Sequence, residues 1–197
     1  LEQIPIIQLP VGGSIKAACY HHKDRELIIA LSTGVLQVFS LRVSRNRATG
    51  RMVYRLPLRM TIEVKTKHNF VTELCVDEKN SLLYGASKQH VFVFDAHQGH
   101  VLGHLRTLPT GTEISTMVCD NDGGKLVALN SQDRQGHWRT TVWEISDADP
   151  HNGQRSIEQQ LQIDFARPLV NIQFVHHESE ILLYIFDAEM IMFIWQV

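Results

Sequence analysis

The sequence predicts an all-β fold built from four repeated antiparallel units. The apolar residues, 44% of the chain, come in short runs that polar turns separate. A similar phrase recurs four times, and a polar turn and further apolar runs follow it each time. A chain of 197 residues is long enough to bury a substantial core in one large or two small domains.

The first strand of each unit is expected in the recurring phrase. The four phrases are residues 15–19, 71–75, 115–119 and 170–174. Three of them end in cysteine (Cys19, Cys75 and Cys119) and the last ends in Phe174. Because unpaired cysteine packs as a small hydrophobic residue, these are predicted to be core thiols in equivalent places. The odd number of cysteines argues against a disulfide framework.

The second and third strands follow as runs rich in leucine, β-branched and aromatic residues. The second strands are predicted at residues 27–31, 82–84, 126–129 and 181–186. The third strands are predicted at residues 35–39, 91–94, 141–143 and 191–195. Each third strand ends in an aromatic residue.

A fourth, outer strand is indicated between units by alternating apolar and polar residues, which suit a half-exposed strand. These segments are residues 52–56, 101–105 and 161–165. Residues 4–9, near the start of the sequence, are a further segment of this kind. A helix over residues 157–161 is the alternative for the third segment, but the alternation of Leu161, Ile163 and Phe165 favours a strand.

Four-stranded antiparallel units repeated around an axis are the blades of a β-propeller. The pattern resembles the WD-repeat propeller family, whose third strands end in Trp-Asp. Residues 143–144, 94–95, 195–196 and 39–40 stand at those positions as Trp-Glu, Phe-Asp, Trp-Gln and Phe-Ser. The Gly-His pair and the loop aspartate typical of that family are not evident. The resemblance implies a single propeller segment over residues 1–197, with units at 12–64, 65–108, 109–165 and 166–197 plus the strand at 4–9.

Two closures of the ring fit the order of strands. In the first, the opening outer strand completes the last blade and four blades close alone. In the second, the four blades are part of a seven- or eight-bladed ring. We expect the second, because four-bladed closure is rare and the first residue is Leu1.

Charge and composition indicate little about partners. Nineteen basic and 21 acidic residues leave a formal charge of −2, which predicts neither nucleic-acid nor membrane binding. No apolar run approaches the roughly 20 residues of a membrane-spanning helix. With no leader and no Asn-x-Ser/Thr acceptor, an intracellular location, cytoplasmic or nuclear, is expected.

The strongest local charge lies between the third and outer strands of the first unit. Residues 42–59 hold six arginines, of which Arg42, Arg45, Arg47 and Arg51 are the predicted interaction residues. Arginine binds carboxylate or phosphate through a bidentate fork, so an acidic protein segment, nucleic acid or a phosphoinositide are candidate partners. The alternative is a solvated loop that nearby acidic turns neutralise. Tyr54 is the one aromatic residue here, which makes nucleic acid the less favoured partner.

A second candidate is the long connection of the third unit, residues 131–139. It contains the predicted interaction residues Arg134, His137, Trp138 and Arg139. Trp and Arg dominate binding energies at interfaces, and insertions within one repeat map to one face. The equal alternative is that Trp138 begins the third strand and packs between blades.

His97, His100 and His104 have a spacing that suggests a zinc site, but Gly99 and Gly103 favour a turn followed by an outer strand. On an outer strand His100 and His104 would lie about 13 Å apart, too far for one ion. The pairs His21-His22 and His176-His177 recur in equivalent turns, which indicates turn solvation.

No nucleophile, phosphate-loop, metalloprotease or dinucleotide motif is present. The sequence therefore predicts no metal, no cofactor and no catalysis. The expected function is a non-catalytic protein–protein interaction scaffold within a larger intracellular complex. A propeller that binds phosphate-bearing ligands is the second hypothesis, and a hydrolase or metal enzyme is the third.

Overall fold

The computed structural model describes residues 7–64, 70–88, 90–105, 111–147 and 155–197, and all regular structure in these ranges is β-strand. The all-β prediction is confirmed. The strands are β1 (Ile15–His21), β2 (Glu26–Leu31), β3 (Val35–Ser40), β4 (Arg42–Arg45), β5 (Met52–Arg55), β6 (Leu58–Glu63), β7 (Glu73–Asp77), β8 (Leu82–Ser87), β9 (His90–Asp95), β10 (Val101–Leu105), β11 (Glu113–Cys119), β12 (Leu126–Gln132), β13 (Trp138–Ile145), β14 (Ile157–Phe165), β15 (Leu169–His177), β16 (Glu180–Asp187) and β17 (Met192–Gln196).

The strands form four antiparallel sheets and one two-stranded ribbon. Sheet 1 has the spatial order β1-β2-β3-β6, sheet 2 the order β7-β8-β9-β10 and sheet 3 the order β11-β12-β13-β14. Sheet 4 has three strands, β15-β16-β17. The ribbon β4–β5 lies between β3 and β6 in the chain.

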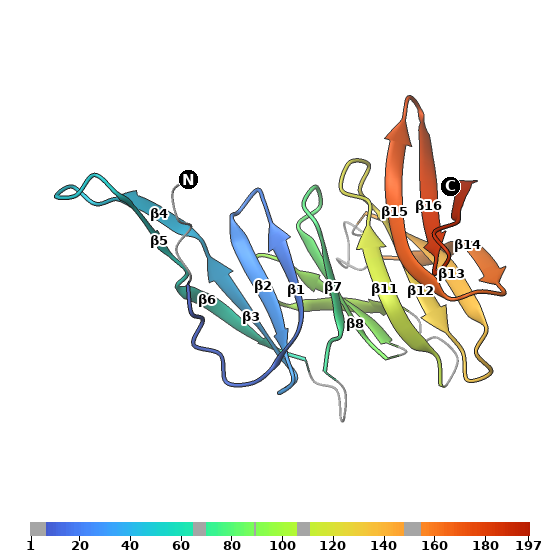
Figure 1. Cartoon of the computed structure of the whole chain (residues 1–197), viewed down its shortest axis with the longest axis horizontal. Helices are drawn as coiled ribbons and strands as arrows, with labels where there is room; N and C mark the ends of the chain where they lie inside the picture. Colours follow the sequence, from blue (N-terminus) through green and yellow to red (C-terminus); the bar gives the residue numbers. More distant parts are fainter. Residues whose placement is uncertain (1–6, 65–69, 89, 106–110, 148–154) are drawn as a thin grey trace.

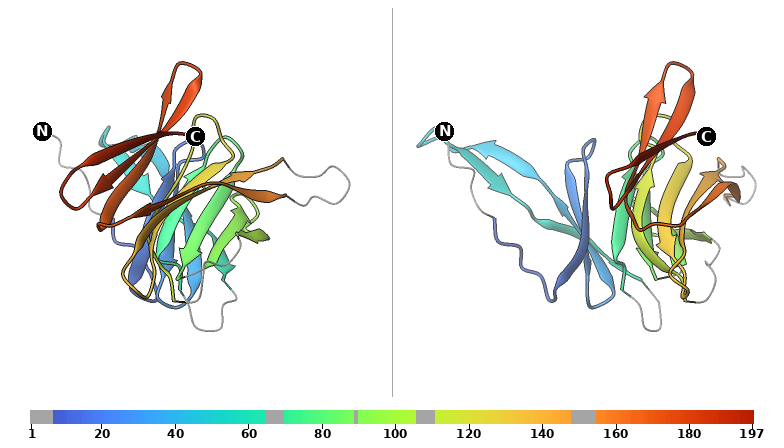
Figure 2. Two further views of the ribbon diagram at one scale, coloured as in Figure 1. Left: turned by 90° about the vertical axis from the view of Figure 1, so that its right-hand side faces the viewer. Right: turned by 45° about the vertical axis from the view of Figure 1, so that its right-hand side comes forward.

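The sheets stand one beside the next in chain order, with sheets 1 and 4 at opposite ends of an open array (Figures 1 and 2). The first strands of successive sheets are in contact, because β1 touches β7, β7 touches β11 and β11 touches β15. The array does not close into a ring.

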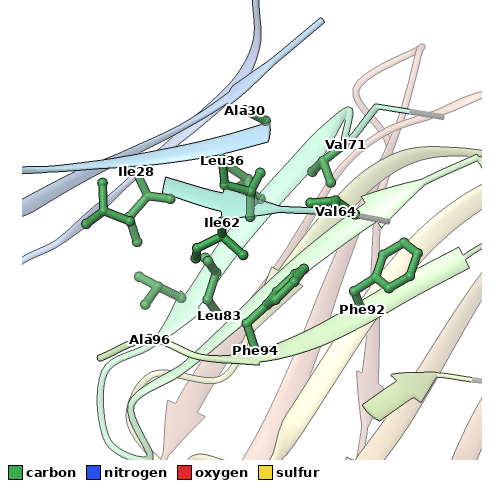
Figure 3. Packing of buried hydrophobic residues seen from close by; sticks show 13 residues of the cluster. Ile28, Ala30, Leu36, Ile62, Val64, Val71, Leu83, Phe92, Phe94 and Ala96 are labelled. Carbon is green, nitrogen blue, oxygen red and sulfur yellow. The ribbon is translucent and has the colours of Figure 1, made fainter. Parts of the chain in front are cut away.

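The hydrophobic core consists mainly of the layers between successive sheets. Figure 3 shows the layer between sheets 1 and 2, where Ile28 and Ile62 meet Leu83 and Phe94. Similar clusters fill the spaces between sheets 2 and 3 and between sheets 3 and 4. Because successive residues of a strand point to opposite faces, a sheet covered on both sides needs a continuous apolar run, not an alternating one. This explains the leucine-rich second strands.

The outer strand of sheet 1 is β6, not residues 52–56 as the sequence analysis predicted. Met60 and Ile62 both point toward the core, so β6 alternates as regularly as the predicted segment. β6 pairs with β3 from Val35 to Phe39. Pro57 has no N–H to donate and separates β5 from β6, while its carbonyl accepts the N–H of Ser40 at 3.1 Å.

Two other outer-strand predictions have different outcomes. Residues 157–161 belong to β14, so the strand interpretation is confirmed over the helix, and the strand begins earlier than predicted. Of the predicted strand at 4–9, residues 4–6 lie outside the described residues and residues 7–9 form no strand. In the described part of the chain, no helix is long and apolar enough to cross a membrane.

Candidate functional site

The arginine-rich segment folds as a β-hairpin that extends the third and outer strands of sheet 1. We call residues 42–55, which comprise β4, β5 and their turn, the arginine ribbon. It projects from the end of the array, away from the other sheets (Figure 1). The register places Arg42 opposite Arg55 and Val43 opposite Tyr54. The predicted loop is therefore an ordered ribbon.

The turn of the ribbon is held by local hydrogen bonds. The side-chain oxygen of Asn46 accepts the N–H groups of Ala48 and Thr49, at 2.9 and 3.1 Å. Gly50 has a φ of 69°, in the left-handed region that glycine adopts without strain. Its carbonyl accepts a hydrogen bond from Nε of Arg45 at 2.9 Å. Such bonds pre-organise the ribbon tip.

The ribbon carries uncompensated positive charge. It contains five arginines and no aspartate or glutamate. Within the described ranges, Arg42, Arg47 and Arg51 are exposed and form no ion pair. Like charges directly opposite on two strands destabilise the pair, and Arg42 and Arg55 are so placed. An anion between their guanidinium groups would remove this repulsion.

One face of the ribbon is apolar. Because opposite residues of an antiparallel pair share a face, Val43, Tyr54, Met52 and Arg45 point to one side, and Arg42 and Arg55 point to the other. Val43, Met52 and Tyr54 are exposed. The ribbon therefore offers a basic face and an apolar face that Arg45 borders.

Arg59 forms an ion pair, unlike Arg42, Arg47 and Arg51 of the arginine ribbon. Its Nε lies 2.5 Å from Oε1 of the buried Glu26, and its Nη2 lies 2.9 Å from Oε2. It also donates to the carbonyls of Ala96 and His97, in the turn after β9. Arg59 thus joins sheets 1 and 2. Neutralisation by acidic groups, the alternative for the whole arginine segment, is seen at this arginine.

The second predicted region is shorter than the sequence indicated. Ser131 and Gln132 end β12, and Trp138 and Arg139 begin β13, so the turn is residues 133–137. The half-buried Trp138 packs against the cluster between sheets 3 and 4. This decides between the two interpretations of Trp138, because it is a strand residue that packs between sheets.

The polar residues of this region have separate surroundings. Arg139 pairs with Asp164 of β14 at 2.5 Å. His137 lies 3.1 Å from the carboxylate of Asp133. Arg134 is exposed and lies over Gly111, where an added Cβ would collide with it. The β12–β13 turn and the arginine ribbon lie toward different ends of the molecule and do not form one surface (Figures 1 and 2).

The sequence analysis missed a set of buried aspartates that anchor turns. Asp77 and Asp120, each 1% exposed, follow or end a first strand and accept two backbone N–H groups of the next turn. Asp187 does the same after β16. The sequence contained a signal for them, because an aspartate at the start of a polar turn commonly accepts the backbone N–H groups two or three residues later.

The paired histidines are not simply solvated. His21 is 1% exposed, so the prediction of turn solvation is wrong for it. Nε2 of His176 lies 2.6 Å from Oδ1 of Asp120, which joins sheet 4 to sheet 3. His97 lies 3.4 Å from the Asp24 carboxylate. The side chain of His104 lies outside the described residues, and within those residues no three His, Cys, Asp or Glu groups are placed to hold a metal ion.

The three cysteines lie on the neighbouring first strands β1, β7 and β11, and they are free thiols. Burial, and secondarily the nearby Cys119, raises the pKa of Cys19 to about 12. Burial, followed by a hydrogen bond with Cys119, raises the pKa of Cys75 well above its ordinary value. Reactive cysteines need a low thiol pKa, so the thiols of Cys19 and Cys75 have the properties of core residues.

We expect stability to fall in alkali because of these thiols. The folded state holds the Cys19 proton up to about pH 12, whereas the unfolded chain releases it near its ordinary pKa of 9.0. The contribution of Cys19 is complete below pH 9 and is lost as pH rises toward 12, at up to about 1.4 kcal/mol per pH unit. Urea denaturation at a series of pH values measures the slope. Cys19→Ala should reduce it, and an unchanged slope would contradict this cause.

Comparison with known proteins gives a likeness of fold. No protein-family model and no curated protein matches the sequence. Among solved structures, the crystal structure of Saccharomyces cerevisiae Sqt1, a WD-repeat protein, matches with a TM-score of 0.66 and 13% identity. The chain has a WD-repeat-like β fold. The match covers 93% of this chain and 44% of Sqt1, so the chain spans less than half the length of that structure.

Proposed function

We propose that the chain is a non-catalytic protein-interaction platform, a set of WD-repeat-like propeller blades within a larger complex, whose arginine ribbon binds an acidic segment of a partner protein. The observation that carries the proposal is the ribbon itself. It is ordered, it projects from the sheets, and its five arginines have no carboxylate among them. The likeness to a WD-repeat structure supports a role in protein interaction.

The two faces of the ribbon favour a protein ligand over a bare polyanion. The basic face suits carboxylates, because guanidinium forks bind them in a bidentate manner. The apolar face, with Val43, Met52 and Tyr54, suits aliphatic side chains. A segment in which acidic and aliphatic residues alternate satisfies both faces. A nucleic-acid backbone leaves the apolar face without a partner.

The rest of the array acts as a rigid support. Sheets packed through continuous apolar layers hold the base of the ribbon in place, and β3 and β6 continue directly into it. Binding residues on a connection that a rigid scaffold positions lose little conformational freedom on binding. Arg134 and His137, exposed at the β12–β13 turn, stay predicted contacts for a second site.

The ribbon is tested by charge reversal. A triple variant, Arg42→Glu, Arg47→Glu and Arg51→Glu, should bind a labelled peptide of alternating glutamate and leucine at least about ten-fold more weakly than the unaltered chain. Exposed ion pairs contribute about 0.2–1 kcal/mol each, and reversal adds repulsion. Fluorescence anisotropy measures the affinity, and far-UV circular dichroism checks that the β-structure is kept.

Matched controls separate this effect from net charge and from phosphate binding. The variant Lys16→Glu, Lys23→Glu and Lys88→Glu makes the same change in net charge at exposed sites outside the ribbon. It should retain most of the affinity. Equal weakening by both variants, or tighter binding of a single-stranded RNA probe than of the peptide, would count against an acidic protein segment as the ligand.

A further inference from the structure

The outer edge of β5 is an unpaired strand edge. In the described part of the chain β5 pairs with β4 alone, and β6, which follows β5, is the last strand of sheet 1. The other edge of the arginine ribbon is more crowded, because the N–H of Leu41, just before β4, donates to the carbonyl of Arg25 at 2.7 Å. An added strand would meet the turn before β2 if it lay along β4. Along β5 it would not.

The hydrogen bonds of the ribbon decide which backbone groups point to this edge. Beside the turn, the N–H of Asn46 donates to the carbonyl of Arg51 at 2.8 Å. Hydrogen-bonded and non-bonded pairs alternate along an antiparallel ladder, so the N–H and C=O groups of Val53, two residues further on, also point to β4. Those of Met52 and Tyr54 point the opposite way. They form the outer edge of β5, ready to pair with another strand.

Side chains alternate along this edge in a pattern that a partner strand can match. Arg51, Val53 and Arg55 point to the basic face of the ribbon, and Met52 and Tyr54 point to its apolar face. Both arginines are exposed, and Met52 and Tyr54 are 49% and 40% exposed. Opposite residues of two paired strands share a face. A strand that pairs with β5 therefore needs acidic residues opposite the two arginines and aliphatic residues opposite Met52 and Tyr54.

The same arginines disfavour a second copy of the chain as the occupant of this edge. Two copies paired antiparallel through β5, centred on Val53, would place Arg51 of each copy opposite Arg55 of the other. Like charges directly opposite destabilise a strand pair, and charged side chains on an edge strand prevent pairing with identical chains. An acidic strand forms favourable pairs at both positions. Charge complementarity thus selects an acidic segment over a second copy.

We propose that the acidic partner segment binds as an added antiparallel strand on the outer edge of β5, with the pattern acidic, aliphatic, any residue, aliphatic, acidic opposite residues 51–55. This inference rests on the proposed function of the arginine ribbon and states how its ligand is held. Hydrogen bonds to the backbone of Met52 and Tyr54 supply affinity, and the alternating side chains supply selectivity. Antiparallel pairing is the more stable arrangement, and a third strand stabilises a ribbon of two.

N-methylated peptides test the backbone bonds. The unmodified probe is a labelled Glu-Leu-Thr-Leu-Glu peptide with blocked ends, and fluorescence anisotropy measures its affinity for the full chain. N-methylation of both leucines removes the N–H groups that donate to the carbonyls of Met52 and Tyr54, so it should weaken binding at least about ten-fold. N-methylation of both glutamates, whose N–H groups point to solvent in this register, is the matched control. It should retain most of the affinity.

A pair of variants tests the same edge from the side of the protein. Tyr54→Pro and Tyr54→Ala both remove the aromatic ring, but only proline also removes the outward N–H. Proline is tolerated on an edge strand where the N–H faces solvent, so the bonds between β4 and β5 are kept. The proline variant should bind the unmodified peptide at least about three-fold more weakly than the alanine variant. Far-UV circular dichroism checks that both variants keep their β-structure.

The outcomes distinguish strand addition from the proposed function. Equal affinities of the three peptides, or of the two Tyr54 variants, would overturn strand addition and leave an acidic segment as the ligand of the ribbon. Absence of binding by the unmodified peptide would overturn both. Weakening by the N-methylated glutamates alone would indicate a parallel strand and overturn the antiparallel register.

Discussion

Phe94→Ala is expected to lower the free energy of unfolding by about 3–5 kcal/mol, the usual range for a phenylalanine lost from a core. Phe94 is 0% exposed and points from β9 into the layer between sheets 1 and 2, among Ile62, Leu83 and Ala96 (Figure 3). Its ring also lies 3.3 Å from the place where Gly85 would carry a Cβ. The strands around it are paired, so they cannot collapse into the cavity.

Urea denaturation followed by tryptophan fluorescence measures this loss. Leu102→Ala is the control, because Leu102 is 40% exposed on β10 and should change stability by less than about 0.5 kcal/mol. A loss below about 1.5 kcal/mol for Phe94→Ala would show that sheets 1 and 2 are not joined by the layer described. The array would then be a row of independently stable sheets.

Arg59→Ala is expected to destabilise the protein by about 2–4 kcal/mol. The substitution leaves the Glu26 carboxylate, 8% exposed, without its guanidinium partner, and an unpaired buried charge costs about 3–5 kcal/mol. Arg59 is itself 30% exposed, so water reaches the vacated place and reduces the loss. The hydrogen bonds to the carbonyls of Ala96 and His97 are lost as well.

A double-mutant cycle isolates the pair. Glu26→Gln with Arg59→Ala should be less destabilising than the sum of the two single substitutions, by about 1–3 kcal/mol. Strictly additive losses would mean that Arg59 acts through packing and not through Glu26. Arg47→Ala, in the free arginine ribbon, should leave stability within about 0.5 kcal/mol. The contrast separates an arginine that joins sheets from one that is free to bind a partner.

Much of the architecture could be predicted from local patterns. The recurring phrases located β1, β7, β11 and β15, because a motif that recurs along the chain marks equivalent strands of a repeated unit. The same logic placed Cys19, Cys75 and Cys119 at equivalent positions. The arginine cluster was also visible, since a run of like charges without acidic residues needs no tertiary information to be found.

The choice of strand partners could not be predicted. Residues 52–56 and 58–62 alternate equally well, but Pro57 and the contacts of Met60 and Ile62 with sheet 2 make the second segment the outer strand. The first segment pairs with β4 instead and forms the arginine ribbon. The sequence around Trp138 likewise fits either a loop or a strand. The structure decides for the strand, because Trp138 of β13 lies opposite Phe165 of β14.

The sequence by itself determined that this protein is built of repeated apolar strands with one excess of arginine. Only the tertiary structure decided which arginines are free, which aspartates are buried and which strand edge is unpaired. The reason is that alternation and charge are properties of neighbouring residues, whereas the pairs Arg59–Glu26 and His176–Asp120 join residues 33 and 56 positions apart. Whether such groups meet depends on how sheets stack, and stacking follows from the burial of whole faces, which no single segment encodes.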